Sequence, residues 1–308
     1  MNIGFIGLGR MGWPIAKRLM AAGHRLTVHD AVLDGPGATD LRAAGAEWAR
    51  NPRDAARGAE IVFTSLPGPD EAREVALGED SILDGASKGA VYVDLTTNSP
   101  QLIRRIYDVY RKRGVDVLDA PVSQGTDARD RHKGTLTVMV GGDAAVYERV
   151  KPVLSILGSE LLYCGESGSG AVCKVVNNVH LFTINAALAE ALTLGVKAGV
   201  PVETLTKAIS LSSARSRPSE VFIASLNKPR FLDNPEGPMV STGLKDVRLA
   251  TELGSDLGVP MELADVAEQA LAEALDRGWG GMQYSANVQV QEEKAGVDLE
   301  PKGATGPG

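Results

Sequence analysis

The chain has 308 residues, of which 44% are hydrophobic and 23% are charged, an ordinary composition for a soluble globular protein. This length predicts about two domains. The net charge of −7 argues against nucleic acid or an anionic membrane surface as the main partner. Two cysteines cannot build a disulfide framework, and no basic leader precedes the first apolar segment. We therefore expect a cytoplasmic protein.

The first feature along the chain is a glycine-rich turn between a strand and a helix. Residues 1–6 form a short apolar strand, and a helical pattern follows Gly12. Gly7 permits the tight turn, Gly9 lets a pyrophosphate approach the backbone, and Gly12 lets the helix pack close to the strand. The phosphates would meet the free N–H groups at the start of the helix. The predicted cofactor-binding turn consists of Gly7, Leu8, Gly9, Arg10, Met11 and Gly12.

An acidic residue ends the second predicted strand. Residues 26–29 form this strand, and Asp30 follows it, eighteen residues after Gly12. A carboxylate at this place can accept hydrogen bonds from an adenosine ribose, and it repels a 2′-phosphate. Asp30 therefore predicts NAD as the cofactor, with NADP less favoured.

Strand and helix patterns alternate through the first half of the chain. Further strands are predicted at residues 61–65, 90–95, 115–119, 135–140 and 160–163, with helices at 101–113 and 144–157 between them. Such alternation is typical of a mainly parallel, doubly wound sheet. After Gly170 helical patterns dominate, at residues 201–211, 219–226, 244–257, 262–275 and 286–293. We predict an α/β fold with a Rossmann-like domain over 1–165, an all-helical domain over 166–295 that begins with a long interdomain helix, and a flexible Gly- and Pro-rich tail over 296–308.

That long helix carries one conspicuous charge. Residues 168–198 predict a buried apolar helix, and no charged residue lies between Lys174 and Glu190. A buried ammonium is costly unless it is paired or its pKa falls. Asn178 lies four residues on, so both side chains leave the same face of the helix. This pattern favours an acid/base and substrate-orienting pair. A lysine whose head group reaches water is the alternative.

With these motifs in place, the chain resembles the β-hydroxyacid dehydrogenase family, which includes 3-hydroxyisobutyrate dehydrogenases, tartronate semialdehyde reductases and 6-phosphogluconate dehydrogenases. The resemblance runs from residue 1 to about residue 293, and residues 4–12 look like the cofactor signature of the family. It implies that Leu66 and Pro67 lie beside the adenosine and pyrophosphate. It also implies that Thr97 places a hydroxyl near the nicotinamide ribose, and that Lys245 closes over the cofactor.

The resemblance also implies the chemistry. Residues 119–123 are similar to the substrate motif of the family, and residues 168–178 to its catalytic motif. A small 3-hydroxy acid would place its carboxylate at Ser123 and the backbone around Gln124 and Gly125. Lys174 would exchange a proton with the hydroxyl, and Asn178 would orient it. An imine reductase-like enzyme and a non-catalytic nucleotide-binding protein are the alternatives, and in both the lysine is expected to be replaced.

Several features depart from the family or stay open. Gln124 stands where the family has glycine, and residues 129–133 form a dense charge cluster. With Arg215 and Arg217, this cluster suggests a substrate with a second anionic group; a solvated loop is the alternative. The four histidines lack metal-ligand spacing, so no metal is expected. The apolar helix predicts a homodimer or homotetramer.

Overall fold

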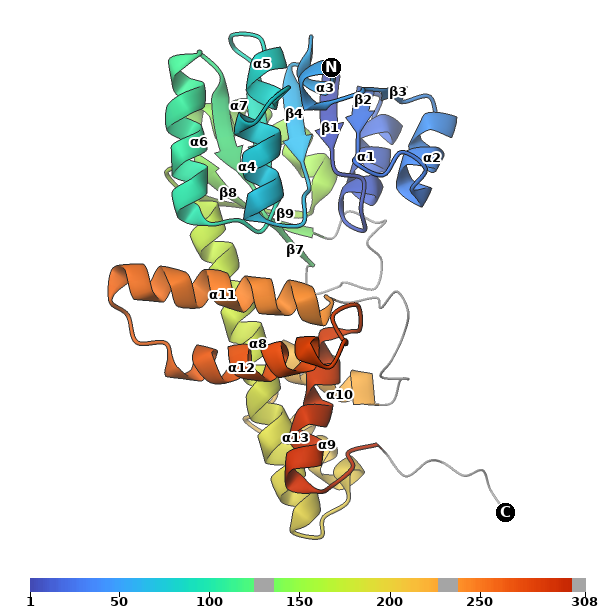
Figure 1. The fold of residues 1–308 in the computed structure, drawn as a ribbon, viewed down its shortest axis with the longest axis vertical. Helices are drawn as coiled ribbons and strands as arrows, with labels where there is room; N and C mark the ends of the chain where they lie inside the picture. Colours follow the sequence, from blue (N-terminus) through green and yellow to red (C-terminus); the bar gives the residue numbers. More distant parts are fainter. Residues whose placement is uncertain (125–135, 227–237, 301–308) are drawn as a thin grey trace. The chain divides into compact units, whose positions relative to one another are not determined.

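The computed structural model describes residues 1–124, 136–226 and 238–300, so Gly125 and the charge cluster at 129–133 lie outside the described residues. The chain divides into two units, Met1–Lys174 and Val175–Gly308, which we call the strand unit and the helical unit (Figure 1). The border falls within helix α8 (Ser169–Lys197).

The strand unit is built on one twisted sheet. Its strands are β1 (Asn2–Ile6), β2 (Arg25–His29), β3 (Glu47–Trp48), β4 (Ile61–Thr64), β5 (Val91–Asp94), β6 (Asp116–Asp119), β7 (Val122–Gln124), β8 (Leu136–Gly142) and β9 (Glu160–Gly165). Their order is β3-β2-β1-β4-β5-β6-β8-β7, and β9 pairs with β8. All pairings from β3 to β6 are parallel, whereas β8 runs antiparallel to β6 and β7. The predicted mainly parallel α/β fold is confirmed.

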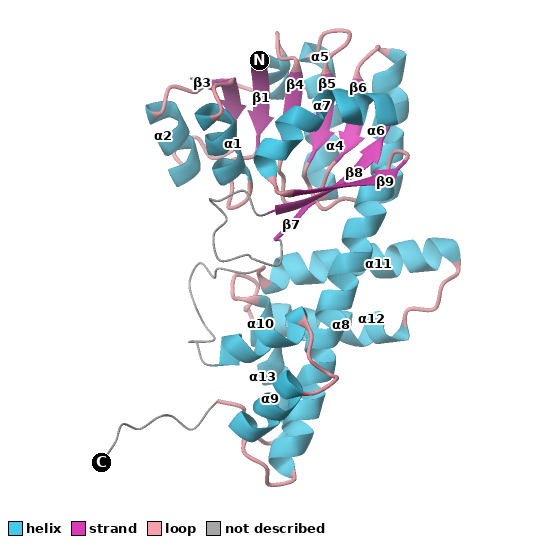
Figure 2. Cartoon of the chain, turned by 180° about the vertical axis from the view of Figure 1, so that it is seen from behind, coloured by secondary structure: helices cyan, strands magenta, loops and turns pink. Residues whose placement is uncertain are grey.

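Helices cover both faces of this sheet, as Figure 2 shows. They are α1 (Gly12–Ala21), α2 (Pro36–Ala43), α3 (Pro52–Ala56), α4 (Pro69–Leu77), α5 (Ile82–Gly85), α6 (Pro100–Lys112) and α7 (Ala144–Leu157). Phe5 and Phe63 pack under α1, α2 and α7, while Ile6 and Val62 pack under α3 to α6. Because both faces are covered, the central strands β1, β4 and β5 are buried along nearly their whole length rather than at alternate residues.

The helical unit contains, besides most of α8, the helices α9 (Val202–Leu211), α10 (Arg217–Leu226), α11 (Val240–Leu257), α12 (Glu262–Asp276), a short 3₁₀ helix η2 (Tyr284–Asn287) and α13 (Val288–Ala295). Phe182 of α8 packs in its core, with its ring edge-on to Tyr284 at 5.4 Å between centroids. A Cβ at Gly243 would lie 2.9 Å from the Phe182 ring, so α11 approaches α8 closely there. Beyond α13 the chain remains packed as far as Leu299, which is fully buried.

Helix α8 matches the predicted long helix, but one side of it is not buried. Val176 is 58% exposed and Leu194 is 72% exposed. Together with the exposed Ala187 and Ala191, they are spaced by helical turns and form a stripe facing away from the core. The predicted buried helix is therefore buried on one side only in the single chain. Length and composition alone would let α8 cross a membrane (mean hydropathy 1.4), but its other side packs in the helical core, as a core helix does.

Candidate active site

The glycine-rich turn has the geometry that a dinucleotide requires. Gly7 has a φ of +91°, and a Cβ there would lie 2.3 Å from the Ser65 carbonyl oxygen. A Cβ at Gly12 would lie 1.9 Å from the Gly7 oxygen, so the first turn of α1 packs directly against the loop. At Gly9, by contrast, no atom lies within 4 Å of the Cβ position. The turn is closed on its protein side and open at Gly9, where a pyrophosphate could approach the backbone.

Asp30 ties this turn to the segment after β2. Its Oδ2 accepts a hydrogen bond from the Leu8 N–H at 2.6 Å, and its Oδ1 accepts one from the Val32 N–H at 2.8 Å. The Leu8 N–H is therefore already used and leaves phosphate binding to the other groups of the turn. A carboxylate oxygen can accept two hydrogen bonds, so Asp30 keeps acceptor capacity for a ribose hydroxyl.

A buried carboxylate organises the loop after β5. Asp94 is fully buried and accepts from the Thr64 hydroxyl at 2.7 Å, the Thr96 N–H at 3.0 Å and the Asn98 amide at 2.9 Å. Burial raises the pKa of Asp94, while these hydrogen bonds oppose that rise. The half-buried Thr97 lies between two residues that this carboxylate holds.

The loop after β4 joins this network. The Leu66 N–H donates to the Thr96 hydroxyl at 3.1 Å, and the Leu66 side chain lies beside Gly7. Pro67 follows and is exposed. The ends of β1, β2, β4 and β5 thus bring together the turn, Asp30, Leu66 and the segment with Thr97, all on one edge of the sheet.

The substrate segment follows β6 and is described only in part. Ser123 lies in β7 opposite Thr137 of β8 and is half-buried. Gln124 is the last residue of β7, and Gly125 lies outside the described residues.

Lys174 lies in the second turn of α8 and is only 8% exposed. It is therefore a buried lysine, which counts against the alternative of a head group in bulk water. Burial is one of the conditions under which a lysine can serve in proton transfer.

Asn178, one turn further along α8, is held by side chains of the helical unit. Its Nδ2 donates to Asp246 Oδ2 at 2.7 Å, and its Oδ1 accepts from the Asn177 amide at 3.0 Å. Lys245 forms an ion pair with Asp246 at 2.8 Å between Nζ and Oδ1. Asp246 is 4% exposed, so the carboxylate is both buried and paired. The Asn178 carboxamide thus has a fixed orientation, with one N–H and one oxygen lone pair left for a ligand.

Asp246 is a functional candidate that the sequence alone did not supply. Its position among Leu244, Val247, Leu249 and Ala250, which are apolar, is a signal of a buried carboxylate. Nothing local, however, identifies Asn178, which is 68 residues away, as its partner.

Arg215 and Arg217 form ion pairs with Glu220. Arg215 Nε lies 2.7 Å from Glu220 Oε1, and Arg217 Nη1 lies 3.7 Å from Glu220 Oε2. The hydrogen bond from Arg215 lowers the pKa of Glu220. Both guanidinium groups are exposed, and one carboxylate balances part of their charge. This pairing weakens the prediction that they bind an anionic substrate.

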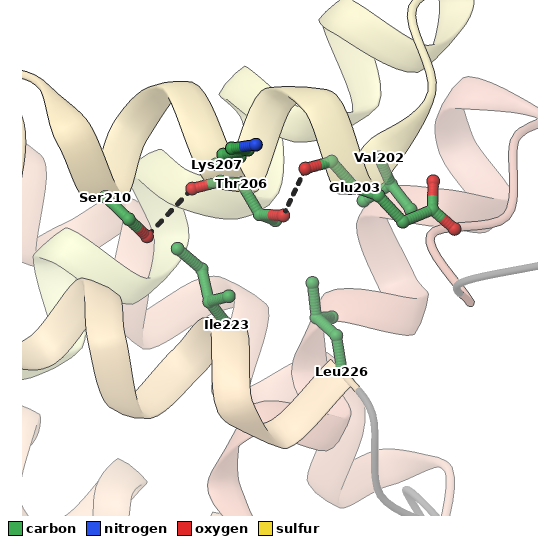
Figure 3. Close-up of a pocket in the computed structure, with 7 residues that line it drawn as sticks. All are labelled: Val202, Glu203, Thr206, Lys207, Ser210, Ile223 and Leu226. Carbon is green, nitrogen blue, oxygen red and sulfur yellow. Dashed lines mark hydrogen bonds between the residues drawn. The ribbon is translucent and has the colours of Figure 1, made fainter. Parts of the chain in front are cut away.

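A groove between α9 and α10 has a volume of about 380 Å³ (Figure 3). It is lined by Val202, Glu203, Thr206, Lys207, Ser210, Ile223 and Leu226. The Thr206 and Ser210 hydroxyls donate to carbonyls of their own helix. The groove contains none of the predicted site residues. Among residues 1–124, 136–226 and 238–300, no group of three or more His, Cys, Asp or Glu side chains could hold a metal ion.

Comparison with known families covers nearly the whole chain. Residues 2–165 match the NAD binding domain of 6-phosphogluconate dehydrogenase. Residues 168–291 match the family described as NAD-binding of NADP-dependent 3-hydroxyisobutyrate dehydrogenase. The family matches therefore divide the chain between β9 and α8.

Individual relatives agree with these matches. The chain is 37% identical to 2-(hydroxymethyl)glutarate dehydrogenase of Eubacterium barkeri, over 97% of each chain. It is 35% identical to 2-hydroxy-3-oxopropionate reductase of Escherichia coli, over 97% of this chain and 100% of the relative. It is 32% identical to 3-sulfolactaldehyde reductase of the same species, over 97% of this chain and 99% of the relative.

Solved structures show the same fold. The 3-hydroxyisobutyrate dehydrogenase of Mycobacterium tuberculosis, solved with L-serine, superposes with a TM-score of 0.82 at 28% identity and covers 94% of this chain and 98% of that one. An imine reductase of Myxococcus stipitatus has a TM-score of 0.62 at 21% identity and covers 94% of this chain and 98% of that one. At this identity the likeness shows the fold alone. The chain belongs to the β-hydroxyacid dehydrogenase family of NAD(P)-dependent oxidoreductases.

Proposed function

We propose that this protein is an NAD-dependent dehydrogenase that interconverts a small 3-hydroxy acid and its semialdehyde, with Lys174 as the general acid/base. The observation that carries the proposal is the burial of Lys174 one helical turn before Asn178, whose carboxamide is fixed by Asp246. A buried amine can be neutral near the working pH and then accept a proton. The fixed carboxamide can hold a hydroxyl in one orientation.

The residues of this chain perform the steps that the cofactor does not. NAD, when bound, supplies the hydride acceptor. The Gly7–Gly12 turn, Asp30, Leu66, Pro67, Thr97 and Lys245 hold it. Ser123 and the backbone around Gln124 and Gly125 bind the substrate carboxylate. Lys174 takes the proton of the substrate hydroxyl during oxidation and returns it during reduction, while Asn178 orients that hydroxyl.

The preference for NAD rests on Asp30. A 2′-phosphate beside this carboxylate would add like-charge repulsion, and part of the hydrogen-bonding capacity of Asp30 remains free for a ribose. A relative at 35% identity, from Pseudomonas aeruginosa, is named an NAD-dependent L-serine dehydrogenase. The test is kcat/KM with each dinucleotide for the wild type and for Asp30→Asn. The wild type should have a higher kcat/KM with NAD than with NADP, and this difference should be smaller in Asp30→Asn. An equal or better kcat/KM with NADP in the wild type would contradict the assignment.

The substrate class that we propose is a 3-hydroxy acid with a second anionic group. One of the relatives named above acts, by its name, on a glutarate, whereas another acts on a sulfonated aldehyde, which has a single anionic group, the sulfonate. Glutarate has two carboxylates. The third relative acts on 2-hydroxy-3-oxopropionate, which has one carboxylate. The pairing of Arg215 and Arg217 with Glu220 counts against these arginines as the second anion site.

A substrate panel tests this proposal. 2-(Hydroxymethyl)glutarate, 3-hydroxyisobutyrate and L-serine would be compared with NAD by nicotinamide absorbance. We expect the dicarboxylate to have the highest kcat/KM. Arg215→Ala should raise the KM for the dicarboxylate more than the KM for 3-hydroxyisobutyrate only if Arg215 reaches the second carboxylate. A clear preference for 3-hydroxyisobutyrate would reject the second anionic group.

We also propose a cytoplasmic homodimer or homotetramer. The exposed apolar stripe of α8 supports this proposal, since Val176 and Leu194 are more than half exposed in the single chain. Light scattering should report an oligomer for the wild type, and Leu194→Glu should lower its apparent mass. A monomeric wild type at micromolar concentration would contradict it.

Neither an imine reductase nor a non-catalytic role is favoured, because this chain has Lys174.

A further inference from the structure

A second buried carboxylate joins the substrate segment to the helix that carries Lys174. Asp119, the last residue of β6, is 2% exposed. Its Oδ1 accepts from the Gly168 N–H at 2.8 Å, and its Oδ2 accepts from the Ala171 N–H at 2.8 Å. Both oxygens are therefore used by the first turn of α8, and Lys174 lies three residues beyond Ala171.

Two glycines leave room for this contact. A Cβ at Gly141 would lie 2.5 Å from Asp119 Oδ1 and 2.8 Å from the Gly170 nitrogen. A Cβ at Gly170 would lie 2.3 Å from the Met139 carbonyl oxygen and 3.0 Å from Asp119 Oδ2. Because any side chain at either position would clash with backbone, the close packing of β6, β8 and α8 depends on these glycines.

A role limited to helix capping does not explain Asp119 well. Helices are usually capped by a Ser, Thr, Asn or Asp at the N-cap itself. Ser167 stands just before α8, yet its buried hydroxyl has no hydrogen-bond partner among the described residues. The first turn is held instead from a strand that lies 49 to 52 residues earlier in the chain. Burial raises the pKa of Asp119, so desolvating this carboxylate opposes folding.

The contact links two parts of the predicted site, the substrate segment with Ser123 and the helix that carries Lys174. The segment from Asp119 to Ser123 runs from the end of β6 into β7, which pairs with β8. We propose that Asp119 is a positioning residue, whose carboxylate fixes the first turn of α8 to this segment and so places the Lys174 amine relative to Ser123. This inference rests on the proposed function, because it assumes that Lys174 and Ser123 act on one substrate.

The variant Asp119→Asn tests it with little change in volume. The amide has an NH₂ group in place of one carboxylate oxygen, so one of the two backbone N–H groups loses its acceptor and faces a donor instead. Deuterium exchange at residues 168–174 should become faster, and Lys174 should be acetylated faster by an amine-reactive ester, followed by peptide mass spectrometry. With 2-(hydroxymethyl)glutarate, kcat should fall about 10- to 100-fold, as for a displaced catalytic group. NADH binding, followed by fluorescence, should be unchanged.

Two controls separate positioning from stability. Tyr110→Phe removes a buried hydrogen bond to the Ala76 carbonyl oxygen in the same unit, and it should lower the melting temperature without changing kcat. Asp94→Asn disturbs the other buried carboxylate, which holds the Thr97 loop, and should raise the KM for NAD more than the KM for the hydroxy acid. If Asp119→Asn does not accumulate, Gly168→Ala weakens the same turn, because Gly168 has a φ of +87°.

The outcomes are distinguishable. Wild-type exchange and wild-type Lys174 acetylation in Asp119→Asn would overturn the inference, and so would faster exchange with unchanged kcat. A loss of NADH binding equal to the loss of kcat would reduce Asp119 to a general structural role and would also overturn it. Exchange and acetylation need no substrate. Failure of the wild type to oxidise any hydroxy acid would therefore count against the proposed function, while these two measurements would still decide whether Asp119 holds the helix that bears Lys174.

Discussion

The glycine-rich turn of the strand unit and the Lys174–Asn178 pair of α8 are built in different ways. The glycine-rich turn depends on the shape of the backbone: a positive φ at Gly7, the absence of a Cβ at Gly12, and free space at Gly9. The Lys174–Asn178 pair depends on two side chains. Two buried carboxylates support it, because Asp119 holds the start of α8 and Asp246 holds the Asn178 carboxamide. A backbone-built site is sensitive to added volume, whereas a side-chain site is sensitive to the loss of a partner.

Replacing Lys174 should have the largest effect. In Lys174→Ala, kcat should fall by ~10²–10⁴-fold, the usual contribution of proton transfer, while NADH binding stays near that of the wild type. Lys197→Ala is the matched control, because Lys197 lies on the same helix and bonds only the Ala295 carbonyl oxygen among its described contacts. If Lys174→Ala kept more than about a tenth of wild-type kcat, a general acid/base role would be untenable.

Removing the carboxylate behind Asn178 should have the next largest effect. Asp246→Ala leaves the Asn178 amide without its charged partner. Hydrogen bonds to charged groups contribute about 1.5–3 kcal/mol, so kcat/KM for the hydroxy acid should fall about 10- to 100-fold. Arg248→Ala, two residues along α11 and paired with Glu268 at 3.1 Å, should leave it unchanged. Equal losses in the two variants would show that α11 matters only for folding.

The glycine turn offers a sharper contrast between two similar changes. Gly12→Ala should destabilise the protein by about 1–3 kcal/mol, because its methyl group would overlap the Gly7 carbonyl. Gly9→Ala should fold normally, since no atom lies within 4 Å of its Cβ position. It should nevertheless weaken NADH binding on the order of tenfold, ~1.4 kcal/mol, because the methyl group would keep the pyrophosphate from the backbone. Thermal melts and NADH titrations measure both. Unchanged NADH affinity in Gly9→Ala would place the pyrophosphate elsewhere.

The smallest effect is a pH dependence of stability at Asp94. Burial raises its folded-state pKa above the ordinary value of 3.8. Its contribution to stability is therefore full below that value and is lost as pH rises through the folded-state pKa. The free energy of unfolding of the wild type, minus that of Asp94→Asn, should decrease in urea titrations as the pH rises above the ordinary carboxyl pKa of 3.8. A difference that grows with pH would mean that the hydrogen bonds to Asp94 outweigh its desolvation.

Local patterns were sufficient for much of the fold. The helix predicted at residues 144–157 has the bounds of α7, and the strand–turn–helix at the N-terminus is present, because neighbouring residues determine both. The two-residue strand β3 and the antiparallel run of β8 were not predicted. A two-residue strand has no periodicity, and direction depends on pairing between distant segments. The partners of Asp119 and Asn178 were missed for the same reason, since 49 to 68 residues separate them.

The passage of α8 through the border between the two units has a practical consequence for dissecting the protein. A cut between Lys174 and Val175 would leave only the first six residues of α8, Ser169 to Lys174, on the N-terminal piece. Isolated helices shorter than about 12–15 residues are marginal in water, so this stub would unwind and take Lys174 with it. A fragment that ends at Gly165 instead keeps the complete sheet and the dinucleotide turn but no part of α8. It is the natural piece for measuring how much of the affinity for NADH belongs to the strand unit alone.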